Sequence, residues 1–112
     1  MGIIQDNSRT SSSSHAQSQY RAPTIQDYDE AIRLNPGNPV AYYNRAVAHT
    51  NIGKFDRAIQ DYDEAIRLNP KYTTAFHGRA VAYANKEQYR RAIEDYDQTL
   101  RLDQNNVTAF YN

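Results

Sequence analysis

The sequence has no cysteine and no tryptophan, and it has only four glycines and four prolines among its 112 residues. The lack of cysteine excludes disulfide frameworks, thiolate zinc sites and cysteine nucleophiles, and it fits a reducing compartment. An excess of charge is also missing, because 13 basic residues balance 13 acidic ones. The chain therefore has no electrostatic footprint for nucleic acid or an anionic membrane, and we expect neither as a partner.

Long apolar segments and targeting signals are missing too. No run approaches the ~18 apolar residues that a membrane-spanning helix needs. Residues 1–22 are rich in serine and lack the apolar stretch of a secretory signal, so we predict a disordered tail. Serine richness with Arg9 and Arg21 leaves an organelle transit peptide as the alternative. By default we expect a cytoplasmic protein.

One stretch of the chain occurs twice without a change. IQDYDEAIRLNP occupies residues 25–36 and again residues 59–70, and a related stretch, IEDYDQTLRLDQ, occupies residues 93–104. The copies lie 34 residues apart. A constant period of this length predicts stacked copies of one supersecondary unit.

The apolar residues of each copy recur at steps of three and four, as Ile25, Tyr28 and Ile32 do in the first, which is typical of one helical face. Proline, glycine and asparagine punctuate the chain between such segments. Thr24 is a candidate helix cap, and Gly53 is placed for a left-handed helix end. We predict helices over about 23–34, 39–52, 55–68, 73–85 and 88–102, and a further helix from Val107.

Short loops make consecutive helices antiparallel neighbours. The chain is then divided into a half repeat (23–38), two full repeats (39–72 and 73–106) and a partial repeat (107–112). A single hairpin cannot cover its own apolar face, so the repeats must stack. The predicted fold is all-α, built from stacked antiparallel hairpins.

This pattern resembles the tetratricopeptide repeat (TPR) family over residues 25–112. The family's series of small and large residues is met by Tyr42, Ala46, Gly53, Phe55, Ala58, Tyr62, Ala65 and Pro70, and by Phe76, Ala80, Tyr83, Tyr89, Ala92 and Tyr96. The resemblance implies a short right-handed solenoid. Arg45 and Arg79 replace the usual leucine, Glu87 the loop glycine, Thr99 an alanine and Gln104 the closing proline, so we expect a looser last unit.

The resemblance also implies a function, because the first helix of each TPR pair lines a concave groove that holds other polypeptides. By register, the expected groove residues are Tyr43, Asn44, Val47, Asn51, Thr74, His77, Val81, Asn85 and Tyr111. We therefore expect an interaction scaffold with a peptide or protein partner. Chaperone-binding members hold a carboxylate with basic residues, but Tyr43, Thr74, Gly78 and Thr108 stand at those places, and only Asn44 matches. No carboxylate clamp is expected.

The incomplete terminal repeats suggest a second function. Each end lacks a neighbouring helix, so apolar side chains there should be exposed and favour self-association. These residues are Ile25, Tyr28 and Ile32 at one end, and Tyr96, Leu100, Phe110 and Tyr111 at the other. The alternative function is a structural unit that forms homo-oligomers without a peptide ligand. A simpler explanation is that the chain is a fragment of a longer TPR protein.

The charged and histidine residues do not form a recognisable catalytic or metal site. Carboxylates two apart on a helix, as in each Asp-Tyr-Asp, point in different directions. The three histidines lack ligand spacing. We therefore expect no cofactor, no metal and no enzymatic activity. Because a partly buried arginine needs an acidic partner, Arg45 is predicted to pair with Asp27 or Asp29, and Arg79 with Asp61 or Asp63.

Overall fold

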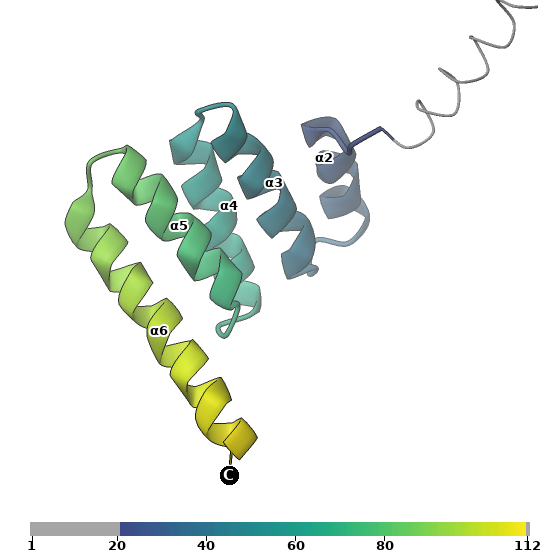
Figure 1. Ribbon diagram of the computed structural model, residues 1–112. Coiled ribbons are helices and arrows are strands. Elements are labelled where there is room, and N and C mark those ends of the chain that lie inside the picture. The colour runs from purple at the N-terminus through teal and green to yellow at the C-terminus, as the bar shows by residue number, and fades with distance from the viewer. Residues whose placement is uncertain (1–20, 112) are drawn as a thin grey trace, which may run out of the picture.

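The computed structural model describes the backbone of residues 21–111 and the side chains of residues 21–104. This part of the chain folds into helices without a strand (Figure 1). The helices are α2 (Ile25–Leu34), α3 (Pro39–Asn51), α4 (Phe55–Leu68), α5 (Thr73–Asn85) and α6 (Tyr89–Tyr111). The predicted all-α fold is confirmed. The predicted disordered tail lies, apart from residues 21–22, outside the described residues.

The helix ends follow local side-chain chemistry. Thr24 Oγ1 accepts a hydrogen bond from the Asp27 amide at 3.2 Å, and the Asp27 carboxylate accepts one from the Thr24 amide at 2.8 Å. This capping box satisfies two amides at the start of α2. Gly53, which follows the end of α3, adopts the left-handed backbone conformation (φ 80°), as predicted. Glu87 (φ 61°) takes the same conformation after α5, where a side chain makes it less favourable.

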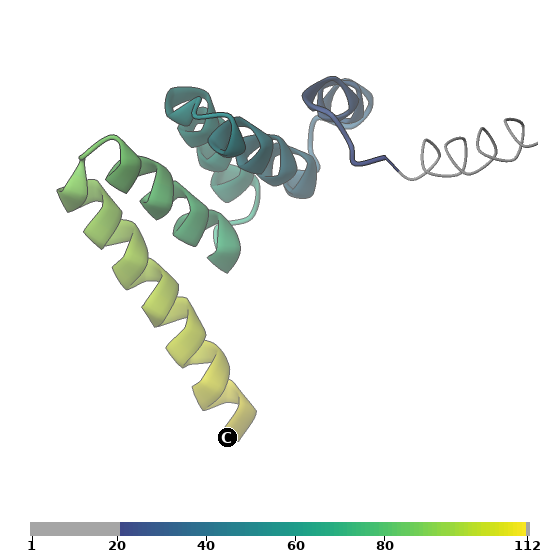
Figure 2. The ribbon, with the colours of Figure 1, turned by 45° about the horizontal axis from the view of Figure 1, so that its top comes forward.

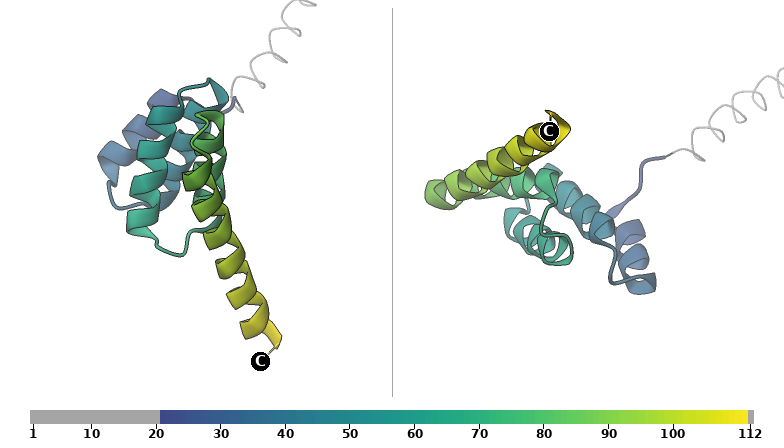
Figure 3. Two further views of the ribbon diagram at one scale, coloured as in Figure 1. Left: turned by 90° about the vertical axis from the view of Figure 1, so that its left-hand side faces the viewer. Right: turned by 90° about the horizontal axis from the view of Figure 1, so that it is seen from below.

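The helices stack as a one-dimensional series of hairpins (Figures 1 and 2). We call α3 and α5 the first-type helices, and α2, α4 and α6 the second-type helices. Each helix packs on its sequence neighbours, and α3 also contacts α5. Within residues 21–111, the second-type helices do not contact one another. The stack therefore curves with α3 and α5 on its inner side, and Figure 3 shows it from two further directions.

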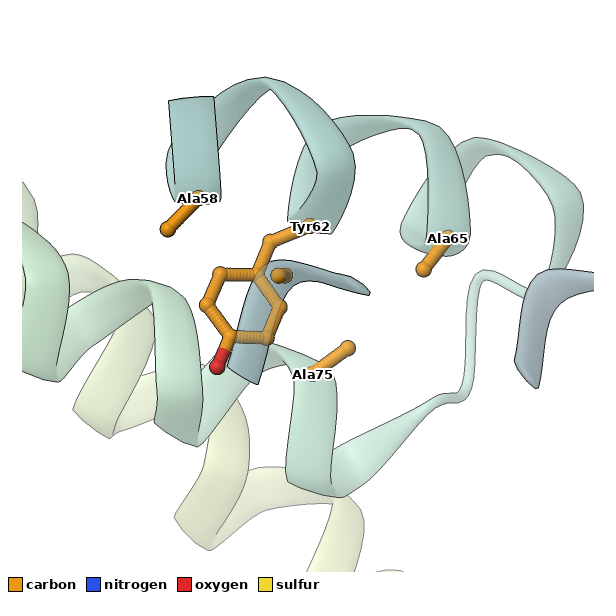
Figure 4. Packing of buried hydrophobic residues seen from close by; sticks show 5 residues of the cluster. Ala58, Tyr62, Ala65 and Ala75 are labelled. Carbon is orange, nitrogen blue, oxygen red and sulfur yellow. The ribbon is translucent and has the colours of Figure 1, made fainter. Parts of the chain in front are cut away.

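Small residues allow the helices to approach closely. Ala46, Ala58, Ala65 and Ala75 are completely buried around Tyr62, which Figure 4 shows pointing from α4 toward α5. Dense packing of this kind leaves little room for an added atom. Gly78 on α5 is one consequence, because a Cβ at that position would lie 2.5 Å from Cζ of Tyr62.

The predicted break between residues 102 and 107 is wrong. The structure has one continuous helix, α6, that runs from Tyr89 to Tyr111. The first and second copies end in Asn-Pro, where proline cannot donate a backbone hydrogen bond, but the third continues Asp103-Gln104-Asn105-Asn106. Nothing in that stretch interrupts helical hydrogen bonding. Residues 107–111 thus extend α6 and do not begin an antiparallel helix.

Candidate functional site

Eight of the nine predicted groove residues lie on α3 and α5, whereas Tyr111 lies at the end of α6 and not on a first-type helix. Tyr43 lies two residues before Arg45, and Val47 lies two residues after it. At about 100° per residue, each of these positions is rotated by about 200° from Arg45 about the helix axis. They are therefore on the side of α3 away from the arginine. His77 and Val81 have the same relationship to Arg79 on α5. Since α3 and α5 contact each other, these four positions lie on two neighbouring helices.

The predicted groove residues differ in how far they reach solvent. Tyr43 is half-buried, with its ring stacked on Tyr72 (centroids 5.1 Å) and meeting Tyr62 edge-on (5.9 Å). His77 is exposed and meets Tyr96 edge-on at 5.7 Å. Of the others, Asn44, Val47 and Val81 are half-buried, and Asn51, Thr74 and Asn85 are exposed. The side chain of Tyr111 lies outside the described residues.

The residues predicted to mediate self-association are unequally exposed at the two ends. Ile25, Tyr28 and Ile32 on α2 are half-buried, although α2 has no fully buried residue. On α6, Tyr96 and Leu100 are both exposed. The Phe110 side chain lies outside the described part of the chain.

Arg45 on α3 joins the helices on either side of it. Its Nη1 donates to Asp29 of α2 at 2.7 Å, which confirms the predicted contact with the preceding helix. Its Nε and Nη2 donate to the two carboxylate oxygens of Asp61 on α4, both at 2.8 Å. The contact with Asp61 was not predicted. These charge-assisted bonds, above all the two that Arg45 donates to Asp61, raise the pKa of Arg45.

Arg79 repeats this arrangement one unit further along. Its Nη1 donates to Asp63 of α4 at 2.8 Å, as predicted, and its Nε and Nη2 donate to Asp95 of α6 at 2.8 Å. We call the two arginines with their four aspartates the arginine–aspartate ladder. In the Asp-Tyr-Asp motif of α4, the first acid pairs within its own unit and the second pairs with the next unit.

His49 is a buried polar residue next to the ladder. Only 6% of it is exposed, and within the described structure its Nδ1 has no hydrogen-bond partner. Its Nε2 lies 3.8 Å from Asp61, beyond hydrogen-bond distance. Burial lowers the pKa of His49, and the charges of Arg45 and Arg57 act in the same direction against the opposing effect of Asp61. Tyr83 occupies the corresponding place in the next unit.

Two similar hollows lie along the stack, each between two second-type helices and next to the first-type helix that separates them. The first, about 410 Å³, lies between α2 and α4, and Arg45, His49 and Arg57 are among its lining residues. The second, about 390 Å³, lies between α4 and α6 and includes Tyr83 and Arg91. Their linings mix acidic, basic and amide side chains. Among the described residues, no group of three or more histidines and carboxylates is placed to hold a metal ion.

None of the helices that the structure describes is both long and apolar enough to span a bilayer.

Two sequence profiles of the tetratricopeptide repeat match the chain, one over residues 39–72 and one over residues 73–106. Together they cover more than half of the chain, so the chain belongs to the tetratricopeptide repeat family. The matched segments coincide with the two full repeats predicted from the period. No curated protein matches the chain.

Solved TPR structures superpose well on this chain. The first TPR domain of Spaghetti (RPAP3), bound to the HSP90 peptide SRMEEVD, is 34% identical with a TM-score of 0.70, and the match covers 72% of this chain and 64% of that one. The TPR domain of Arabidopsis OM64 is 32% identical with a TM-score of 0.70, covering 71% and 66%. These neighbours share the helical-repeat fold of this chain.

MamA is a longer relative in structure. It is 25% identical with a TM-score of 0.73, and the match covers 75% of this chain. The chain spans about half of the MamA chain, with 49% covered.

Proposed function

We propose that the inner surface of α3 and α5 binds an extended, uncharged peptide segment of a partner protein. The observation that carries this proposal is the direct contact of α3 with α5, which makes one continuous surface of two helices. The expected groove positions on it bear no Lys, Arg, Asp or Glu. An acidic or basic ligand would lose hydration there without gaining a counter-charge.

The exposed groups of this surface suit a peptide backbone. Asn51 and Asn85 each carry a carboxamide that can both donate and accept, as extended peptide backbones require. The Asn85 amide nitrogen already donates to the Val81 carbonyl at 2.9 Å, so its Oδ1 is the atom offered to a ligand amide. His77 is exposed and contributes an aromatic face for a ligand side chain.

The carboxylate-clamp mode does not fit this surface, although Spaghetti domains are bound to the HSP90 peptide SRMEEVD in their solved structures. Tyr43, Thr74 and Gly78 stand where a clamp requires basic side chains. The arginines of the first-type helices are engaged in the ladder instead. This chain therefore selects a different, uncharged peptide.

The experiment is a selection from a peptide library followed by affinity measurements on variants. Asn51→Lys and Val81→Lys place a charge in the proposed groove and should weaken the selected peptide at least about tenfold, which corresponds to about 1.4 kcal/mol. Gln60→Lys, an exposed substitution on second-type helix α4, is the matched control and should leave affinity unchanged. Equal effects of all three, or tight binding of SRMEEVD, would contradict the proposal.

A second candidate function is self-association through the terminal helices. The specific observation in its favour is the exposed apolar face of α6, where 62% of Leu100 is accessible. Light scattering over a dilution series tests it. A strict monomer at high concentration removes this candidate and leaves groove binding unaffected.

A further inference from the structure

The outward face of α6 repeats a face that α4 buries. Ile59 and Tyr62 on α4 are 9% and 3% exposed where α5 packs over them. The same residue types one period later, Ile93 and Tyr96, are 58% and 37% exposed. The difference follows from the absence, among residues 21–104, of another first-type helix beyond α6.

A carboxylate on α6 belongs to the same exposed face. Asp29 and Asp63 each bind the arginine of the first-type helix that follows, at 2.7 and 2.8 Å. Asp97 is the third member of this series. Within residues 21–104 no ion pair involves Asp97. Its register predicts a partner equivalent to Arg45 or Arg79.

The chain itself contains a first-type helix that fits α6. Helix α3 offers Arg45 and the surface that α2 covers. Helix α2 is the weakest element of the stack, since it has ten residues and none is buried. Helix α2 and helix α6 carry the same residue types, isoleucine, Asp-Tyr-Asp, arginine and leucine, at positions two periods apart. The outward face of α6 is therefore nearly the same as the face by which α2 packs on α3.

We propose that α6 of one copy displaces α2 of a second copy and packs on its α3, with Asp97 replacing Asp29 on Arg45. Ile93, Tyr96 and Leu100 then take the places of the corresponding apolar residues of α2. The contact is head-to-tail, so each copy can donate α6 at one end and accept at the other. This proposal rests on the self-association candidate and gives it a defined partner and register.

The exchange costs little free energy because the interactions that form resemble those that break. Helix α6 stays helical in both states, since its other side packs on α5. A displaced α2 is too short to remain helical by itself, because isolated helices under about 12 residues are marginal in water. Its release returns conformational entropy, which offsets part of the cost of association.

Two isosteric substitutions test the proposal because they act in opposite directions. Asp97→Asn removes the charge of the invading helix and should weaken association, measured by sedimentation velocity, about fivefold. Asp29→Asn weakens the helix that must leave and should strengthen association about threefold. Asp103→Asn, an exposed acid on α6 outside this register, is the matched control and should have no effect.

Hydrogen exchange of the full chain distinguishes helix exchange from simple stacking. With rising concentration, amides of residues 25–34 should lose protection while those of residues 93–102 gain it. Gain of protection at both ends, no association at millimolar concentration, or parallel effects of the two substitutions would overturn the proposal. The groove test above uses variants of α3 and α5 at concentrations where the chain is monomeric, so its outcome is independent.

Discussion

Arg45 and Asp61 form a two-bonded ion pair between α3 and α4, with the guanidinium Nε and Nη2 each 2.8 Å from a carboxylate oxygen. Asp61 is only 6% exposed. A charge this deeply buried is tolerated because its partner satisfies both oxygens. The same geometry recurs between Arg79 and Asp95, so one pair of residues joins the two helices of each hairpin.

Removing the arginine alone should therefore be costly. Arg45→Leu restores the residue usual in the family but leaves the Asp61 charge buried and unpaired, and we predict a loss of about 3 kcal/mol in the free energy of unfolding. Urea denaturation measures the change. The double substitution Arg45→Leu with Asp61→Leu should recover most of this loss. If the single variant were as stable as the parent, the ion pair would have no structural role.

The outer acid of the ladder should contribute much less. Asp29 bonds the same guanidinium, but its side chain is 53% exposed. Solvent screens such pairs, so Asp29→Asn should cost about 0.5 kcal/mol in the free energy of unfolding. Asp63→Asn is the equivalent change at Arg79 and should behave alike. A loss as large as that of Arg45→Leu would mean that α2 is held mainly by this bond.

The buried histidine should make stability depend on pH. Burial lowers the pKa of His49 in the folded chain, while the unfolded chain takes up the proton below about pH 6.5. Stability should therefore fall as the pH drops below about 7 through the folded pKa, and this contribution should then level off.

Replacing His49 isolates this contribution. His49→Phe removes the unpartnered Nδ1 and should raise the free energy of unfolding at neutral pH by about 1 kcal/mol. Between about pH 7 and 5, the free energy of unfolding should also fall less in this variant than in the parent protein. His77→Phe, at an exposed histidine on α5, is the control. An unchanged pH profile for His49→Phe would show that the fall arises elsewhere.

The contact of Gly78 with Tyr62 predicts an unusual effect of alanine in a helix. Alanine ordinarily stabilises a helix interior by about 1 kcal/mol over glycine. At Gly78 the added Cβ would lie 2.5 Å from the Tyr62 ring, which is buried, so overpacking should outweigh that gain. We predict a net loss of about 1 kcal/mol by thermal or urea unfolding. Gly37→Ala, whose nearest contact is 3.8 Å, should not destabilise by overpacking.

Much of this architecture could be predicted from the sequence because it repeats. The repeat period, together with the prolines and glycines between the segments, predicted the ends of α3, α4 and α5 to within a residue. The recurrence of Arg45 and of the aspartates at the same period predicted a contact between Arg45 and Asp27 or Asp29, and the structure shows it with Asp29. The contact of Arg45 with Asp61 of the following helix was not predicted. The signal was present, since Asp29 and Asp61 both lie 16 residues from Arg45.

Other features depend on packing that no local pattern reports. The continuation of α6 past Leu102 was not predicted, because residues 107–112 resemble the start of a first-type helix. Residues 103–106 contain no proline or glycine, so the helix continues through them. The buried, unpartnered Nδ1 of His49 arises from its surroundings in three dimensions. The sequence shows only that an aromatic residue, Tyr83, stands one period after His49.

The most direct test of groove binding is an amide-shift titration of the chain with a peptide selected from an uncharged library. We predict that Asn44, Val47, His77 and Val81 shift together and saturate with one affinity. Shifts confined to residues 25–32 and 96–111, or spread over the ladder side of the stack, would contradict binding by the inner surface of α3 and α5.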